Sequence, residues 1–219
     1  MSESRGRSEP IYATGDRRTG DAPHDHESVY DFFVDLIQGG FAQVTILTLP
    51  VLFVLAATPV YTIEMGTAAV VSVLTLTFFL PLFRGGHLSA GRPWPVLTNR
   101  KLGTGTGYRA LFTRAVLLSC SLLLAAYTAV IVELVTGSFL ANALTALVLS
   151  AAALVALPHL SADSRRARLA RLGYCLAGFL PMVVLFALTP AAPEPGLVAL
   201  VAVVLVAVVA DARTALVSR

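Results

Sequence analysis

The chain has 219 residues, of which 56% are hydrophobic and 13% are charged, and its mean hydropathy is +0.77. Soluble globular domains are about 45–50% apolar and about 25% charged, so this composition excludes an ordinary soluble domain. The net charge of +3 combines an acidic N-terminal region with arginine-rich segments further on, so it does not indicate nucleic-acid binding.

Residues 1–28 are rich in Gly, Ser, Asp and His and show no apolar periodicity. Such a segment cannot bury enough apolar surface to fold, so we predict a disordered, acidic cytoplasmic tail. No signal peptide precedes the first apolar run, and we expect the chain to be retained whole.

Residues 29–40 differ from the tail, because apolar side chains share one face of a predicted helix while Asp31 and Asp35 lie elsewhere. Gly39-Gly40 is predicted to end this helix. The pattern predicts a short amphipathic helix in the inner membrane interface, with a plain extension of the first span as the alternative. The apolar face consists of Phe32, Phe33, Leu36 and Ile37.

Six apolar segments of about 17–22 residues follow, a length that matches a hydrocarbon core about 30 Å thick. They predict an all-α fold in which residues 41–219 form a polytopic membrane bundle of six transmembrane helices in three hairpins. The predicted spans are 41–61, 67–83, 115–135, 139–160, 173–189 and 197–211.

The basic residues predict the orientation of these spans. All 16 Lys and Arg fall in the tail, in the loops after the second and fourth spans, or at the C-terminus. None falls in the turns at 61–66, 136–138 and 190–196. Because basic residues collect in cytoplasmic loops, both termini are predicted to be cytoplasmic and the protein to lie in the cytoplasmic membrane. The composition, with fifteen Arg and one Lys, indicates a GC-rich genome. The acidic, lysine-poor tail is similar to that of haloarchaeal proteins, with an actinobacterial source as the alternative.

Proline and small residues within the spans predict how the helices pack. Pro50 and Pro181 should each kink a span and leave one carbonyl without its donor. Small residues four apart let two helix backbones approach closely. Hydroxyl donors for the carbonyl freed by Pro50 are expected from Thr45, Thr48, Thr75 and Thr77. The small-residue pairs are Gly173 and Ala177, Ala125 and Ala129, and Ala146 and Ser150.

Ionisable residues inside spans are the first candidates for function in such a protein. Glu133 and Asp211 are the candidates here, and both are predicted to lie near an interface, hydrated or paired with Arg. His159 is predicted to lie at the inner end of the fourth span as an interface residue.

The predicted inner loops carry the densest positive charge. Four cations within the loop at 161–172 are expected to hold the orientation and to contact lipid head groups. The Gly-rich segment 102–108 is predicted to be a flexible connector near head groups, with Trp94 as an interfacial anchor. The residues predicted to contact head groups are Arg165, Arg166, Arg168, Arg171, Arg100, Lys101 and Trp94.

No motif for catalysis, metal binding or a cofactor is found, and Cys120 and Cys175 are predicted to be buried as small apolar side chains. We therefore expect a non-catalytic multi-pass membrane protein, an accessory or assembly factor. The alternative is a permease-like transport subunit for a lipid or hydrophobic substrate, working as an oligomer. A third hypothesis, a head-group enzyme using His87 and His159, has the least support.

The expected partners are membrane lipids. Beyond lipids, small-residue helix faces or the cytoplasmic loops are expected to contact a second copy or a protein partner.

Overall fold

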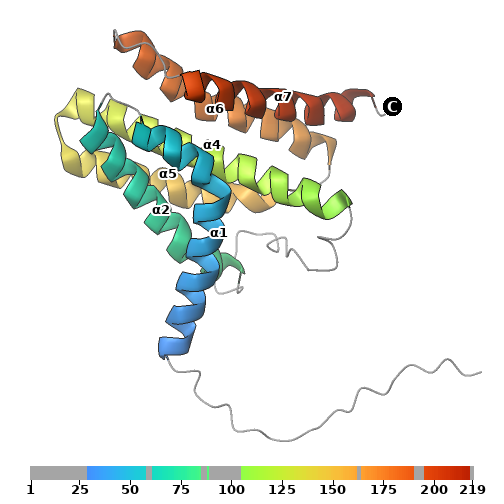
Figure 1. The fold of residues 1–219 in the computed structure, drawn as a ribbon, viewed down its shortest axis with the longest axis horizontal. Helices are drawn as coiled ribbons and strands as arrows, with labels where there is room; N and C mark the ends of the chain where they lie inside the picture. Colours follow the sequence, from blue (N-terminus) through green and yellow to red (C-terminus); the bar gives the residue numbers. More distant parts are fainter. Residues whose placement is uncertain are drawn as a thin grey trace, which may run out of the picture.

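A computed structural model describes residues 29–57, 61–84, 88, 105–161, 164–189 and 195–217. Throughout these residues the regular structure is α-helical (Figure 1). The predicted tail, Trp94, Arg100 and Lys101 lie outside the described residues. The helices are α1 (Val29–Ala57), α2 (Thr62–Arg84), α4 (Gly105–Thr136), α5 (Phe139–Leu160), α6 (Arg165–Leu188) and α7 (Pro195–Val217).

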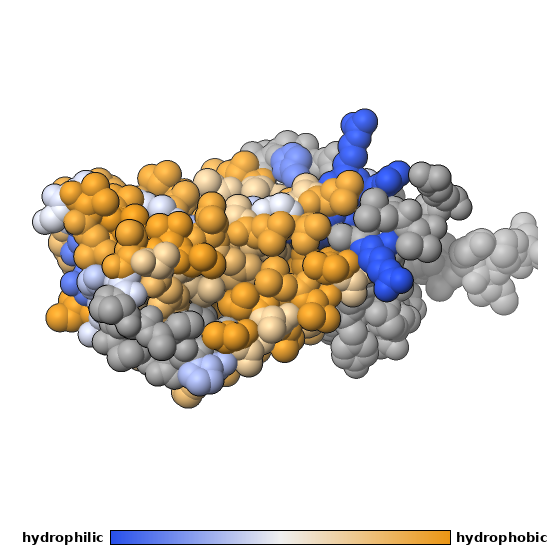
Figure 2. All heavy atoms as spheres, turned by 90° about the horizontal axis from the view of Figure 1, so that it is seen from above, coloured by the Kyte–Doolittle hydropathy of each residue, from blue (hydrophilic) through white to orange (hydrophobic). Residues whose placement is uncertain are grey.

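Four of the described helices are long and apolar enough to cross a membrane, which indicates a membrane protein. They are α2, α4, α5 and α6, and each overlaps one of the predicted spans over all or nearly all of its length. The apolar parts of α1 and α7 are shorter, Gly40–Ala56 and Val201–Ala210. Figure 2 shows an apolar surface over most of the length of the molecule, with hydrophilic side chains projecting toward one end.

Helix α4 is the centre of the bundle. In the apolar stretch of α4, 72% of the residues are buried inside the bundle. The corresponding share in α2, α5 and α6 is 33–44%. It packs against α1, α2, α5 and α6, whereas α7 packs chiefly on α6 (Figure 1). The described part of α7 is therefore the peripheral element.

Helix α1 runs without interruption through Gly39 and Gly40, so the predicted helix end at these glycines is wrong. Gly40 serves packing instead, because an added Cβ would lie 2.6 Å from the carbonyl oxygen of Thr77 and 2.8 Å from Pro81 Cγ. A glycine costs about 1 kcal/mol inside a helix relative to Ala, and here it permits close approach of α1 and α2. An interfacial position for residues 29–38 stays a prediction.

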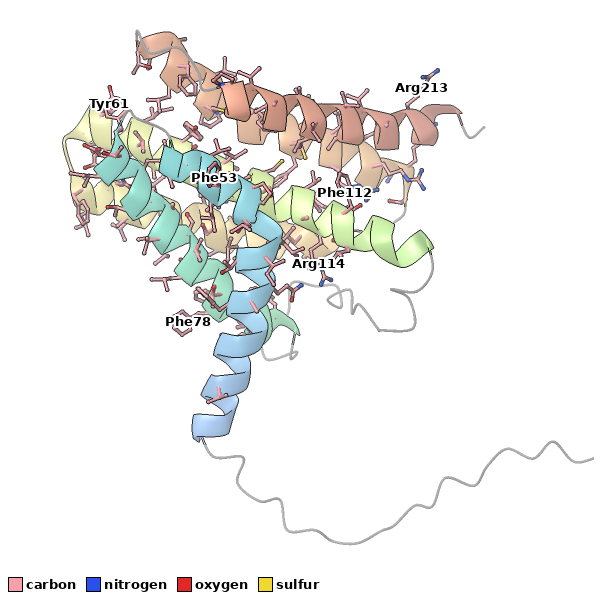
Figure 3. All side chains as sticks on the ribbon, viewed as in Figure 1. Phe53, Tyr61, Phe78, Phe112, Arg114 and Arg213 are labelled. Carbon is pink, nitrogen blue, oxygen red and sulfur yellow. The ribbon has the colours of Figure 1, made fainter. Side chains whose placement is uncertain are left out.

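The proline in α1 lies where the helix changes direction. Figure 1 shows the bend, and Figure 3 places Phe53 beside it, three residues after Pro50. The expected threonine donors do not serve the freed carbonyl. Thr48 and Thr75 donate to the carbonyls of Val44 and Val71, each four residues earlier in its own helix. The hydroxyls of Thr45 and Thr77 have no partner among the described residues.

Two helices begin before the spans that hydropathy predicted, so parts of the predicted loops are helical. Helix α6 begins at Arg165, because the side chain of Ser164 accepts a hydrogen bond from the N–H of Ala167 and caps the helix. The arginine cluster therefore lies in the first turns of α6 rather than in a loop. Helix α4 begins at Gly105, so residues 105–108 of the Gly-rich segment are helical.

Two of the three predicted small-residue pairs are buried between helices. Ala125 and Ala129 of α4 and Ala146 and Ser150 of α5 are all 0% exposed. Gly173 and Ala177 of α6 are exposed, and no described atom lies within 4 Å of a Cβ built at Gly173. The close contact of α6 is made one residue after Ala177. An added Cβ at Gly178 would lie 3.0 Å from the carbonyl oxygen of Cys120.

Candidate functional site: a polar junction between three helices

The bundle has two chemically different ends. One, called here the turn end, holds the start of α2, the α4–α5 turn and the end of α6. The other, the arginine end, holds the start of α6. Figure 3 shows Tyr61 at the turn end and Arg213 at the arginine end.

A completely buried carboxamide joins three helices at the turn end. Asn142, in the first turn of α5, is 0% exposed. Its Nδ2 donates to the carboxylate of Glu133 on α4 and to the main-chain oxygen of Glu64 on α2, the latter over 3.1 Å. Asn142 Oδ1 is buried and has no partner among the described residues. We call Asn142, Glu133 and Glu64 the polar junction.

The α4–α5 turn positions two members of the polar junction. Gly137 has φ +67°, a left-handed conformation that suits glycine, and its N–H donates to the carbonyl of Glu133. Ser138 then caps α5 by accepting from the N–H of Ala141. This two-residue turn brings the last turn of α4 beside the first turn of α5, so Glu133 meets Asn142.

Next to the polar junction, on the side toward the arginine end, α2, α4 and α5 contact one another through small side chains. Helices α2 and α5 run in the same direction and α4 runs against them (Figure 1). Residues four and eight positions beyond the junction therefore form successive layers on the same helix faces. All of these residues are 0% exposed: Ala68, Ala129 and Ala146 in the first layer, and Ser72, Ala125 and Ser150 in the second.

The second layer brings two buried hydroxyls to one level of the bundle. Neither the Ser72 nor the Ser150 hydroxyl has a hydrogen-bond partner within the described part of the chain. Small side chains let the helix backbones approach, and the two hydroxyls place polar atoms in the interior of the bundle. The junction and its two layers thus tie together the helices on which the rest of the bundle packs.

A second polar contact joins α4 to α6. The hydroxyls of Ser121 and Tyr174 lie 2.7 Å apart, and Ser121 also donates to the carbonyl of Leu117. Tyr174 therefore donates to Ser121. The free thiols of Cys120 and Cys175 contact each other beside this pair, and both cysteines are 0% exposed. The prediction that both cysteines are buried is confirmed.

The arginine end is less uniform than the sequence predicted. Arg165 and Arg166 are exposed and Arg168 is partly exposed, but Arg171 is 6% exposed. The predicted head-group cluster is thus split by burial. Arg114 of α4, which was expected in a loop, is 7% exposed within the helix.

The other predicted ionisable candidates do not join these contacts. His159 is exposed, and its ring nitrogen Nδ1 lies 3.3 Å from the carbonyl of Val155. Asp211 lies on α7 toward the arginine end, and its side chain is outside the described part. Glu133 is near the end of α4 as expected, but its partner is Asn142 rather than Arg.

Sequence reasoning missed Asn142. The signal was a carboxamide four residues after Ser138, on the helix face that also carries Ala146 and Ser150. A polar side chain on a small-residue face is typical of a contact between helices. Across the described ranges no group of three His, Cys, Asp or Glu comes together as for a metal ion.

The comparisons with known proteins give one match. The sequence profile of a family described as Domain of unknown function (DUF8215) matches residues 29–164, more than half of the chain. The matched region contains α1, α2, α4 and α5, including the whole polar junction, and ends at the capping residue of α6. No curated protein and no solved structure matches the chain.

Proposed function

The chain belongs to the DUF8215 family, and we propose that it is a non-catalytic multi-pass protein of the cytoplasmic membrane that acts as an accessory or assembly factor. Six spanning helices with both termini in the cytoplasm complete this proposal. The turn end then faces outward and the arginine end faces the cytoplasm.

The main support for the proposal is that buried polar side chains join the helices to one another. Asn142 joins α2, α4 and α5, and Tyr174 joins α6 to α4. Such contacts hold a helical bundle together in lipid, where association lacks the hydrophobic driving force available in water. An enzyme or a polar-solute carrier needs its polar groups directed toward a substrate. The polar groups that join these helices are directed toward one another instead.

The outer surface supports contact with other membrane components. Large apolar side chains are exposed on α5 and α6, for example Val148 at 59% and Leu180 at 62%. Gly173 and Ala177 are exposed on α6 with four-residue spacing, which suits the approach of a second helix. Lipids and a partner helix are therefore the proposed binding partners.

The orientation rests on the cations at the arginine end. Arg165 and Arg166 are exposed in the first turn of α6, where anionic lipid attracts each basic residue by about 1 kcal/mol. The polar junction at the opposite end carries carboxylates instead. This asymmetry is the one expected when the arginine end is cytoplasmic.

Photo-crosslinking combined with gene deletion tests the proposed function. A photoreactive residue is introduced at Leu180 on α6, at Val148 on α5 and, as a control, at the completely buried Leu154. We expect a discrete protein adduct from an exposed site and none from position 154. The level of that partner in the membrane should fall when the gene is deleted and recover with the wild-type gene. Movement of a lipid or hydrophobic dye by the purified protein across liposomes would instead support a transport subunit.

A further inference from the structure

Two cysteines from different helices meet in the interior of the bundle. Cys120 of α4 and Cys175 of α6 are free, both are 0% exposed, and their thiols contact each other. The chain contains 2 cysteines, so each of them has the other as its neighbour. Two free thiols in contact are the reactants from which a disulfide is made.

The main chains of α4 and α6 also approach closely at this level. A Cβ built on Gly178 would lie 3.0 Å from the carbonyl oxygen of Cys120 and 3.3 Å from its Cβ. The residues next to the two cysteines, Ser121 and Tyr174, have hydroxyls 2.7 Å apart. The Cα atoms of two bridged cysteines lie about 4–7 Å apart, so a disulfide requires such an approach of the main chains. The thiols can therefore be joined while α4 and α6 keep their packing.

A positive charge lies close to the pair. Arg171 precedes Cys175 by one helical turn, so the two side chains share a face of α6, and Arg171 is 6% exposed. The thiolate is the form of cysteine that attacks an oxidant, and a neighbouring cation favours that form. Cys175 is therefore placed to react first, with the thiol of Cys120 beside it to complete the bond.

We propose that Cys120 and Cys175 are a redox pair that hydrogen peroxide converts into a disulfide between α4 and α6. The first sulfur attacks the peroxide, so an S–O bond forms, the O–O bond breaks and one water leaves. The second sulfur then attacks this sulfenic acid, so the S–S bond forms, the S–O bond breaks and a second water leaves. The two thiol protons end in the two waters, and the two electrons lost by the sulfurs reduce the peroxide.

Burial of the pair selects the oxidant by size. Helices open locally and transiently, and such an opening admits a small uncharged molecule far more readily than a bulky thiol reagent. The second thiol already contacts the sulfur that is oxidised, so the disulfide should form before further oxidation of that sulfur.

The disulfide would join two parts of the bundle covalently. Helix α7 packs chiefly on α6, and α6 packs chiefly on α4 and α7. Cys120 lies in the region that matches the DUF8215 family, whereas Cys175 lies beyond it. The bond would therefore fix α6, and α7 with it, to the helices of the matched region, and it should stabilise the bundle.

Thiol counting on the full-length protein in detergent tests the pair. The protein is treated with hydrogen peroxide and denatured, and its free thiols and intact mass are measured. We expect 2 free thiols before treatment and none after it, with the mass lower by two hydrogen atoms. The product should migrate as a single chain on a non-reducing gel, and dithiothreitol should restore both thiols. Its midpoint of thermal unfolding should lie about 5–10 °C above that of the reduced protein.

The double variant Cys175→Ser with Ala177→Cys is the matched control. It keeps two thiols, but one of them lies on the exposed face of α6, away from Cys120. Peroxide should form no disulfide within this chain. The wild-type measurement needs no substitution, so it stands even if the control does not fold.

Four results would overturn the proposal. The first is a wild type that keeps both thiols in peroxide, and the second is a loss of thiols that dithiothreitol does not reverse. The third is a disulfide that forms only between chains. The fourth is a bond within the chain of the control variant that forms as fast as the bond in the wild type.

Discussion

Gly40 of α1 lies against the main chain of Thr77 on α2, so that a Cβ at position 40 would stand 2.6 Å from the Thr77 carbonyl oxygen. Real Cβ atoms do not approach an oxygen this closely, and the main chain of α2 cannot rotate away as a side chain can. This contact fixes how the continuous helix α1 packs on α2.

Gly40→Ala should therefore lower the free energy of unfolding by about 1–3 kcal/mol, the usual cost of overpacking. Gly66→Ala on α2 is the matched control, since no described atom lies within 4 Å of its added Cβ. The control should be neutral or more stable by about 0.5–1 kcal/mol, because alanine favours the helix. Denaturant unfolding in detergent measures both. Equal stability of the two variants would contradict the close contact.

The contact of α6 with α4 gives a second pair of variants on one helix. Gly178→Val places a branched side chain against the main chain of Cys120, where even a Cβ would be 3.0 Å from the carbonyl oxygen. We expect a loss of about 1–3 kcal/mol and faster thiol labelling of Cys120. Gly173→Val, on the exposed face of α6, should be neutral or slightly stabilising, because only helix propensity changes and Gly is the poorer helix former of the two. Identical losses would show that α6 does not pack as described.

The hydrogen bond between Tyr174 and Ser121 can be measured with a double-mutant cycle. Tyr174→Phe removes the donor and Ser121→Ala removes the acceptor. Coupling between such groups in membrane proteins averages about 0.6 kcal/mol and reaches about 1.7 kcal/mol. Unfolding of the two single variants and the double variant should give a coupling in this range. A coupling indistinguishable from zero would show that the two hydroxyls do not interact.

At the polar junction, the stability of a variant at position 133 should depend on whether the new side chain can accept a hydrogen bond. Glu133→Gln keeps an oxygen that accepts from Asn142 Nδ2, so its stability should stay near that of the wild type. Glu133→Ala leaves a buried donor without this acceptor, which costs about 1–3 kcal/mol. Thermal unfolding in detergent distinguishes the two variants. If both were equally stable, Asn142 would not depend on Glu133.

Hydropathy predicted the helices well where they are apolar. The predicted span 139–160 coincides with α5. The sequence marks its start with Gly137, which adopts a left-handed conformation in the turn, and with Ser138, which caps the helix. Helix α6 begins eight residues before the predicted span 173–189. Its first turns carry Arg165, Arg166, Arg168 and Arg171, and a hydropathy window treats such charges as a loop although the Ser164 cap begins a helix there.

The polar junction could not be predicted in the same way. Asn142 lies 9 residues after Glu133 and 78 residues after Glu64 along the chain. Only the packing of α2 on α5 brings Glu64 to Asn142. Gly40 was misread for a similar reason, because a glycine that ends a helix and a glycine that admits a neighbour look alike in sequence. Glu133 was predicted as an interfacial carboxylate, but its partner depended on tertiary structure.

The most direct test of the proposed membrane arrangement is labelling of introduced cysteines in intact cells with a membrane-impermeant maleimide. Thr136→Cys marks the turn end and Arg166→Cys marks the arginine end; both positions are exposed, whereas the native cysteines are completely buried. The cysteine at 136 should react in intact cells, and the cysteine at 166 should react only after the membrane is broken. Labelling of position 166 in intact cells, with position 136 protected, would contradict the arrangement.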